Sequence, residues 1–98
     1  MTMNNTNPHE VDVPEAIKTE LEVRLRDAFG AASLETFCWH EPPEGVVAAF
    51  AIDGTLHQIA NYHASLDLFE QWLEAIDLSS LGLWVESVNG CDHHIYKA

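Results

Sequence analysis

Between Asp27 and Tyr96, a stretch of seventy residues, the sequence contains neither lysine nor arginine. The whole chain has 4 basic side chains against 16 acidic ones, which gives a formal net charge of −12. A surface of this charge repels the phosphates of nucleic acids and anionic lipid headgroups, and it attracts proteins with cationic patches. We therefore expect no direct contact with nucleic acid or membrane, and a partner protein with a basic surface.

Long apolar runs are missing as well. The longest, Val46–Ile52, has seven residues, whereas a membrane-spanning helix needs roughly 18 or more. The first residues, MTMNNTNPHE, lack the basic region and the apolar core of a secretory signal. The two cysteines fit free thiols in a reducing compartment. These features predict a cytoplasmic protein, in the host cytoplasm if a phage encodes it.

The common catalytic and nucleotide-binding motifs are also absent. There is no G-x-S-x-G, no P-loop, no G-x-G-x-x-G and no H-E-x-x-H pattern. Trp39, Trp72 and Trp84 stand among acidic residues, unlike the aromatic residues that stack on nucleic-acid bases beside cations. We therefore expect no enzymatic activity and no cofactor.

The 98 residues, 47% of them hydrophobic, suffice for one folded domain. Residues 1–12 are predicted to be a flexible polar tail, and residues 13–98 a single α+β domain. A first helix is predicted over residues 14–29, where Pro14 suits the first turn and Gly30 the residue after the last.

A second helix is predicted to begin at Ser65 or Asp67, because either side chain can cap the first N–H groups, and to have Asp77 at its C-terminus, before Ser79-Ser80 and Gly82 break it. Its buried stripe is predicted from apolar residues at helical spacing. This stripe consists of Leu68, Phe69, Trp72, Leu73 and Ile76.

Five strands are predicted, at residues 33–40, 46–52, 55–61, 83–88 and 91–97. Asp53-Gly54 and Asn89-Gly90 are dipeptides that tight hairpin turns prefer, so each is predicted to join the strands on either side of it. The second turn places His93 across from Glu86. The resulting order is α-β-β-β-α-β-β, with two helices packed on a mainly antiparallel sheet of about five strands.

The strand at residues 46–52 is apolar at every position, so neither of its faces is polar. If both helices cover one face of the sheet, the other face carries an apolar patch of the kind that marks interfaces. The sequence therefore predicts a two-fold homodimer through the sheet. Helices on opposite faces would instead give a monomer.

Four carboxylates follow the second helix at spacings of three, four and three residues: Asp67, Glu70, Glu74 and Asp77. This spacing places them on one side of the helix, where like charges cost a few tenths of a kcal/mol per pair. A solvated helix face is the alternative explanation, but such a face usually mixes charges of both signs. We take the four, with Glu41 and Glu44 of the turn at 41–45, as candidate partner-binding residues.

Two Cys-x-His pairs, one at Cys38 and His40 and the other at Cys91 and His93, suggest a metal site. Residues i and i+2 of a strand share a face, so two such pairs on adjacent strands would supply the ligands of a tetrahedral zinc ion. Free thiols and ordinary histidines are the simpler explanation, and we expect no metal. The Cys38, His40, Cys91 and His93 set is the weaker alternative.

The leading interpretation is a small acidic inhibitor that docks on a basic, nucleic-acid-binding surface of a partner. In size and acidity the chain resembles phage-encoded DNA mimics and anti-CRISPR proteins, and bacterial immunity proteins that neutralise nucleases. Its predicted element order and acidity also resemble type III secretion chaperones, which implies an acidic dimer. The third alternative is a Cys/His metal-binding protein or small enzyme.

Overall fold

Residues 8–98 are described by a computed structural model, and side chains are described from residue 15 onward. Its elements follow the order α-β-β-α-α-β-β, with two additional 3-10 helices. They are α1 (Pro8–Phe29), η1 (Ala31–Thr36), β1 (Phe37–His40), β2 (Ala48–Ile52), α2 (Gly54–Ala60), α3 (Leu66–Ala75), η2 (Ser79–Leu81), β3 (Leu83–Ser87) and β4 (Asp92–Lys97). The predicted α+β class is confirmed, with four strands in place of about five.

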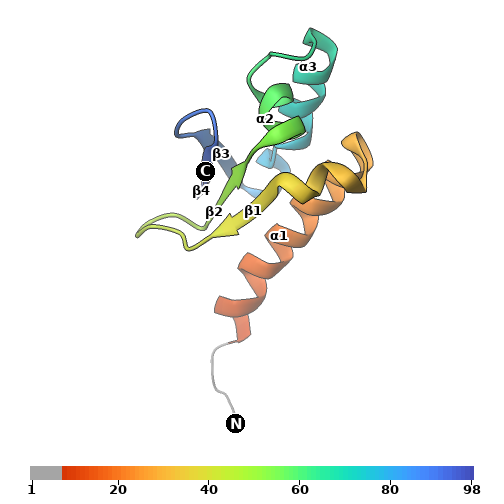
Figure 1. Cartoon of the computed structure of the whole chain (residues 1–98). Helices are drawn as coiled ribbons and strands as arrows, with labels where there is room; N and C mark the ends of the chain where they lie inside the picture. The colour runs from red at the N-terminus through yellow and green to blue at the C-terminus, as the bar shows by residue number, and fades with distance from the viewer. Residues whose placement is uncertain (1–7) are drawn as a thin grey trace.

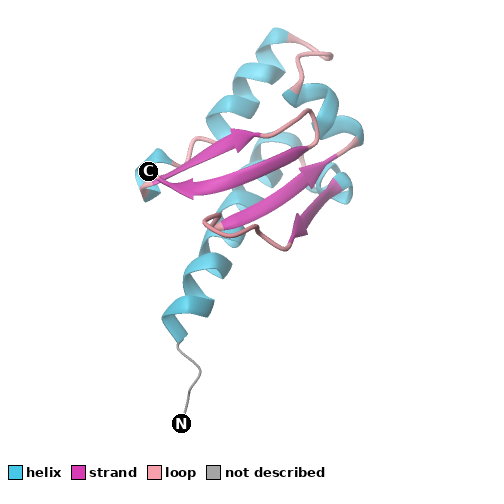
Figure 2. Cartoon of the chain, turned by 90° about the vertical axis from the view of Figure 1, so that its left-hand side faces the viewer, coloured by secondary structure: helices cyan, strands magenta, loops and turns pink. Residues whose placement is uncertain are grey.

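The four strands form one antiparallel sheet in the order β1-β2-β4-β3. Figure 2 shows this sheet in front of the helices, which lie behind a single face of it. The inward side chains of the strands, including Phe50, Ile52, Leu83 and Ile95, are buried against apolar residues of the helices. No described helix covers the opposite face of the sheet, which we call the open face.

The first helix is longer than predicted. α1 begins at Pro8, so residues 8–12 of the predicted tail are helical, and Pro14 lies inside the helix. Proline is well suited to the first helical position, and Pro8 occupies it. Residues 1–7 lie outside the described part of the chain. The predicted C-terminal end is confirmed: Gly30 has a φ of 88° and its N–H donates to the Arg26 carbonyl at 2.8 Å.

The predicted strand at residues 55–61 is wrong, and so is its hairpin with β2. Asp53 caps the helix α2 instead of starting a turn, because its carboxylate accepts a hydrogen bond from the Gly54 N–H at 2.8 Å. In a strand Leu56 and Ile59 would point to opposite faces, whereas in α2 both are buried in the same core.

The predicted register of the last hairpin is off by one residue. The connection is longer than the dipeptide at 89–90, since the Val88 and Asn89 N–H groups both donate to the Asp92 carbonyl, at 2.9 and 3.4 Å. Glu86 therefore lies across from His94, and the predicted pairing of Glu86 with His93 is wrong. A shift of one residue turns every side chain to the other face, so His93 points into the core.

His93 is only 3% exposed and is packed between two aromatic rings. Its imidazole stacks on Phe50 with the ring centroids 4.8 Å apart, and the Trp72 ring lies edge-on at 5.8 Å. Nδ1 donates a hydrogen bond to the Cys91 carbonyl at 3.0 Å. Burial lowers the pKa of His93 below the ordinary value of 6.5, although the Cys91 carbonyl and the Asp92 carboxylate oppose this shift.

None of the described helices combines the length and the apolar character needed to cross a membrane.

Gly54→Ala tests the start of α2. Gly54 has a φ of 56°, and a Cβ there would lie 2.9 Å from Cγ2 of Thr36. We expect the free energy of unfolding to fall by about 2 kcal/mol, from backbone strain and this contact together. Thr36→Ser removes Cγ2, so the Gly54→Ala/Thr36→Ser pair should recover the contact part in a double-mutant cycle by denaturant unfolding. A Gly54→Ala variant as stable as the wild type would contradict this geometry.

The buried imidazole predicts a pH dependence of stability. Below about pH 6.5 the unfolded state binds a proton at His93 that the folded state excludes, so the free energy of unfolding should fall as the pH falls. The decline should flatten once the pH is below the lowered folded-state pKa. His93→Gln should remove this slope between pH 5 and 6.5 (roughly the range before most carboxylates titrate), whereas His40→Gln, at an exposed site, should keep it. Equal slopes in all three proteins would contradict the prediction.

Candidate protein-binding surface

Three of the predicted partner-binding carboxylates lie together on α3. Asp67, Glu70 and Glu74 are all exposed, and with Gln71 they line a shallow depression of about 290 Å³. The helix begins where it does because the Ser65 hydroxyl accepts a hydrogen bond from the Leu68 N–H at 3.1 Å. No ion pair reaches these three carboxylates from any other described residue. We call Asp67, Glu70 and Glu74 the acidic row.

Asp77, the fourth predicted member, has a local structural role. α3 ends at Ala75, and Asp77 follows it. Hydrogen bonds from the Ser79 side chain and from its N–H lower the pKa of the Asp77 carboxyl. The Asp77 main-chain carbonyl accepts a hydrogen bond from a guanidinium nitrogen of Arg24 at 2.6 Å. The fold thus holds Arg24 of α1 just beyond the C-terminal end of α3, although no lysine or arginine is near Asp77 in the sequence.

Glu41 and Glu44 are separated from the acidic row. Both are exposed in the loop between β1 and β2. In Figure 1 this loop projects to the left beyond β1 and β2, while α3 lies at the top of the molecule. The six predicted partner-binding residues therefore do not form one patch, and a partner that covers the acidic row need not reach the loop.

Beside the acidic row, α3 carries exposed apolar side chains that the sequence did not reveal. Leu66 is 50% exposed and Leu73 is 48% exposed, although Leu73 and the half-buried Phe69 were both predicted to be in the buried stripe. Tyr62, 58% exposed at a φ of 64°, stacks on Phe69 with the ring centroids 5.7 Å apart. We call Tyr62, Leu66, Phe69 and Leu73 the apolar ridge.

The ridge leads to a hollow between the end of α3 and the edge of the sheet. This α3–β3 hollow has a volume of about 250 Å³, and its apolar lining includes Leu73, Ile76, Trp84 and Val85. Trp84 is 47% exposed. Leu73 belongs to both the apolar ridge and the hollow, so the two form one continuous apolar surface and not scattered single residues.

No protein-family model, curated protein or solved structure matches the chain. The function is therefore inferred from the chemistry of the surface.

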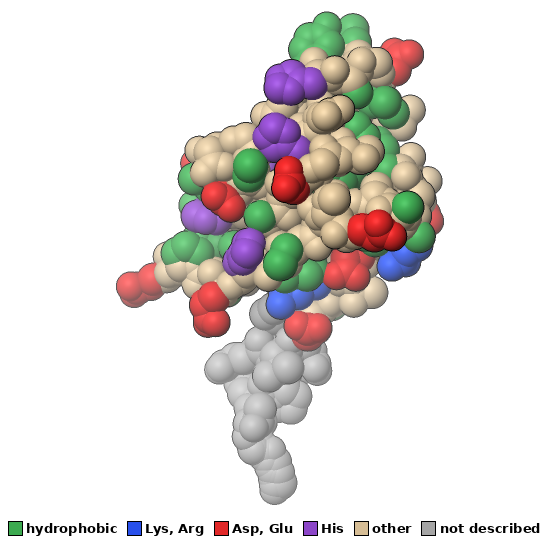
Figure 3. All heavy atoms as spheres, in the orientation of Figure 1, with side chains coloured by type: hydrophobic (Ala, Val, Ile, Leu, Met, Phe, Trp, Pro, Cys, Tyr) green, Lys and Arg blue, Asp and Glu red, His purple; other side chains and the backbone are tan. Residues whose placement is uncertain are grey.

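The charge of that surface is almost entirely negative. Figure 3 shows acidic side chains spread over the visible face, with Lys and Arg side chains only in its lower part. Lys18 and Arg24 are paired within α1, with Glu15 at 3.4 Å and Glu20 at 2.8 Å. Two of the four cations are thus paired within their own helix, and no other ion pair forms among the described residues.

The open face of the sheet is polar and aromatic. Trp84 stacks on Tyr96 with the centroids 4.8 Å apart, and the Tyr96 hydroxyl donates to Glu86 at 3.0 Å, which raises the pKa of Tyr96. From β2 this face has only the side chains of Ala49 and Ala51. Of the two predicted arrangements, the structure has the helices on one face, but the other face is not the continuous apolar patch from which the homodimer was inferred. The homodimer stays a prediction.

The four side chains of the weaker zinc alternative do not come together in the fold. Cys38 and His40 point to the open face from β1, whereas His93 is buried on the helix side, and β2 separates β1 from β4. Cys91 is exposed in the loop before β4. Within residues 15–98 no three His, Cys, Asp or Glu side chains are grouped so that they could hold a metal ion.

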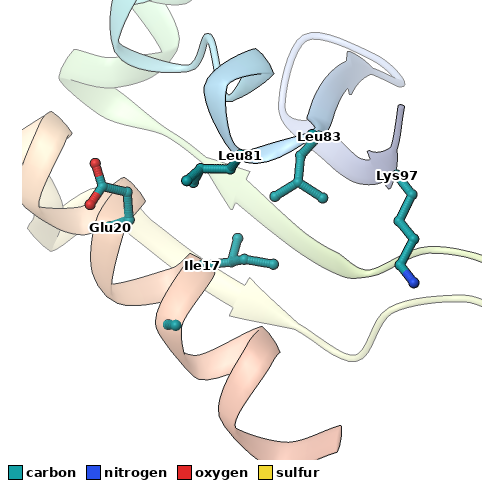
Figure 4. A pocket seen from close by; sticks show the side chains of 7 residues that line it. Ile17, Glu20, Leu81, Leu83 and Lys97 are labelled. Carbon is teal, nitrogen blue, oxygen red and sulfur yellow. The ribbon is translucent and has the colours of Figure 1, made fainter. Parts of the chain in front are cut away.

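Another hollow, of about 480 Å³, lies between α1 and the segment around η2. Figure 4 shows Ile17, Leu81 and Leu83 directed toward one another there, with Glu20 and Lys97 on opposite sides. Glu20 is already paired with Arg24. Among the described side chains that line the hollow, Glu20 and Lys97 are the titratable ones, and they do not form a group suited to catalysis.

Neutralising part of the acidic row tests its electrostatic cost. We expect Glu70→Gln/Glu74→Gln to keep the fold and to raise the free energy of unfolding by a few tenths of a kcal/mol at low salt. The gain should shrink at high salt, where the repulsion is screened. Asp67 is left unchanged because a carboxylate in the first turn is favoured by the helix dipole. Denaturant unfolding at both salt concentrations measures the difference, and a loss of stability would contradict the prediction.

Proposed function

We propose that the chain is a small acidic protein-binding protein, an inhibitor that docks on a basic, nucleic-acid-binding surface of a partner protein. One observation carries the proposal: on α3 the acidic row Asp67, Glu70 and Glu74 is exposed, unpaired among the described residues, and adjacent to the apolar ridge. Protein interfaces combine an apolar centre with a polar rim in this way. A helix face that contacts only solvent would not be expected to have exposed apolar side chains beside its carboxylates.

The row supports a DNA-mimic, anti-CRISPR or nuclease-immunity type of inhibitor. Carboxylates three or four residues apart on a helix lie roughly 5–6 Å from one another. Arginine and lysine side chains that bind phosphates also bind carboxylates, and arginine does so with two parallel hydrogen bonds. A groove lined by such cations can therefore accept the row in place of nucleic acid.

The two alternative functions gain less support. The likeness to type III secretion chaperones depended on the element order α-β-β-β-α-β-β, and the third of those strands is the helix α2. The metal-binding alternative depended on Cys38, His40, Cys91 and His93, whose side chains lie on different faces of the sheet or in a loop. A cytoplasmic location, expected from the sequence, is part of the proposal.

Affinity capture with the tagged full chain, followed by mass spectrometry, tests the function. The captured partner should bind nucleic acid, elute at high salt, and release a bound DNA fragment when the chain is added. Asp67→Lys/Glu70→Lys/Glu74→Lys should weaken the complex and flatten its salt dependence, because rim charges mainly set the association rate. Asp77 is spared for its bond to Ser79.

The matched control is Glu41→Lys/Glu44→Lys, which changes exposed charge away from α3. A triple variant with unchanged affinity and salt dependence would exclude the acidic row. A complex weakened only by the loop variant would place the interface at the loop between β1 and β2 instead of at α3.

A further inference from the structure

β3 is an edge strand of the described sheet, so only alternate residues of it direct their N–H and C=O groups toward β4. The Val88 N–H donates to the Asp92 carbonyl at 2.9 Å, and the Ala98 N–H donates to the Gly82 carbonyl at 2.8 Å. Because hydrogen-bonded pairs alternate along an antiparallel ladder, the even-numbered residues of β3 are the ones bonded to β4.

The odd-numbered residues of β3 therefore direct their N–H and C=O groups away from β4. Leu83 confirms the direction, since its N–H donates to the Leu78 carbonyl outside the sheet at 3.2 Å. Val85 and Ser87 follow at the same spacing, so their backbone groups lie along the free edge. An exposed row of this kind is a template for another strand.

The α3–β3 hollow adjoins this edge. Val85 belongs both to the edge and to the lining of the hollow, and Leu73 and Ile76 line it from α3. A strand added beside β3 would direct alternate side chains into the hollow and the others to the open face, beside Trp84 and Glu86. The hollow thus supplies apolar contacts next to a row of free backbone hydrogen-bonding groups.

Carboxylates lie on both sides of this edge. Two cations approach its beginning, Arg24, which is paired with Glu20 and donates to the Asp77 carbonyl, and Lys97, which lies opposite Leu83. Asp77 lines the hollow, and Glu86 is exposed on the open face of β3 itself. Glu74 of the acidic row follows Leu73 in the last turn of α3, the turn that adjoins the hollow. An added strand is therefore complementary when its residues outside the hollow are cationic.

We propose that the free edge of β3 binds an extended segment of the partner, in which apolar residues alternate with lysine or arginine, as an added strand of the sheet. The apolar residues occupy the α3–β3 hollow, and the cationic residues face Glu86 and the acidic surroundings. This inference rests on the proposed function in one respect, the positive charge of the partner. Strand addition of this kind gives affinity through the backbone and specificity through alternate side chains.

A second copy of the chain is the competing occupant. Each copy has a formal charge of −12, so pairing two β3 edges brings two strongly negative surfaces together. A cationic segment gains from the same field. The charge therefore favours a basic partner over self-association at this edge.

The test uses the full chain labelled with ¹⁵N and a short capped peptide of alternating lysine and valine as the probe. We expect the largest changes of amide signals at Val85, Ser87 and Leu73. A peptide of alternating glutamate and valine should cause none of them. The lysine peptide with N-methylated valines should also cause none, because it cannot complete the ladder.

Ser87→Pro removes one outward N–H and blocks the edge without disturbing a bond to β4. It should weaken probe binding by at least about fivefold, whereas Ser87→Ala, which keeps the N–H, should change it less than about twofold. Leu73→Ser should also weaken binding by about fivefold or more. Leu81→Ser is its matched control, since Leu81 has the same exposed fraction of 48% and lies outside the hollow.

Amide changes that avoid β3, or equal binding of the lysine and glutamate peptides, would overturn the proposal. So would sedimentation of the chain as a dimer that Ser87→Pro dissociates, because the edge would then belong to a second copy. A captured cationic partner that Ser87→Pro leaves unaffected would refute the strand addition and leave the proposed function standing. Loss of partner binding only on reversal of the acidic row leads to the same conclusion.

Discussion

The stacking of His93 on Phe50 sets the register on which the rest of the sheet depends. The two residues face each other across β2 and β4, with Trp72 of α3 edge-on to the imidazole. With His93 inside, His94 and Tyr96 must point outward, and the pairing of β4 with β3 then turns Trp84 and Glu86 to the open face. The same register directs the backbone groups of Val85 to the free edge. One buried aromatic contact thus decides both the chemistry of the open face and the side of β3 that a partner can reach.

α3 is the element where packing and recognition meet. One side of the helix is buried through Trp72 and Ala75, a second carries the apolar ridge, and the third carries the acidic row. The buried side fixes the helix on the sheet, so the other two sides are held in a constant position relative to β3. Repulsion within the row costs little because each carboxylate is solvated. A helix with three such sides can place an apolar contact and its charged rim against one partner.

The parts of the fold with a local chemical cause were predictable. Apolar spacing with Gly30 located the end of α1, and Ser65, one of the two predicted caps, is at the start of α3. Residues 54–60 were not, because Asp53-Gly54 serves equally well as a hairpin turn and as a helix start. The choice depended on whether Leu56 and Ile59 could both enter the core, which only the packed helix allows. The two Cys-x-His pairs are kept apart for a similar reason, because β2 lies between β1 and β4.

The sequence by itself determined the sign of the surface charge, the α+β class and the position of the acidic row, because composition and spacing along one helix do not depend on distant contacts. Only the tertiary structure decided that Leu73 is exposed, that Arg24 reaches the Asp77 carbonyl, and that β3 has a free edge beside a hollow. Periodicity shows which residues share a side of a helix, but exposure is set by what packs against that side. The same is true of a strand, whose edge is free or paired according to neighbours that are distant in the sequence.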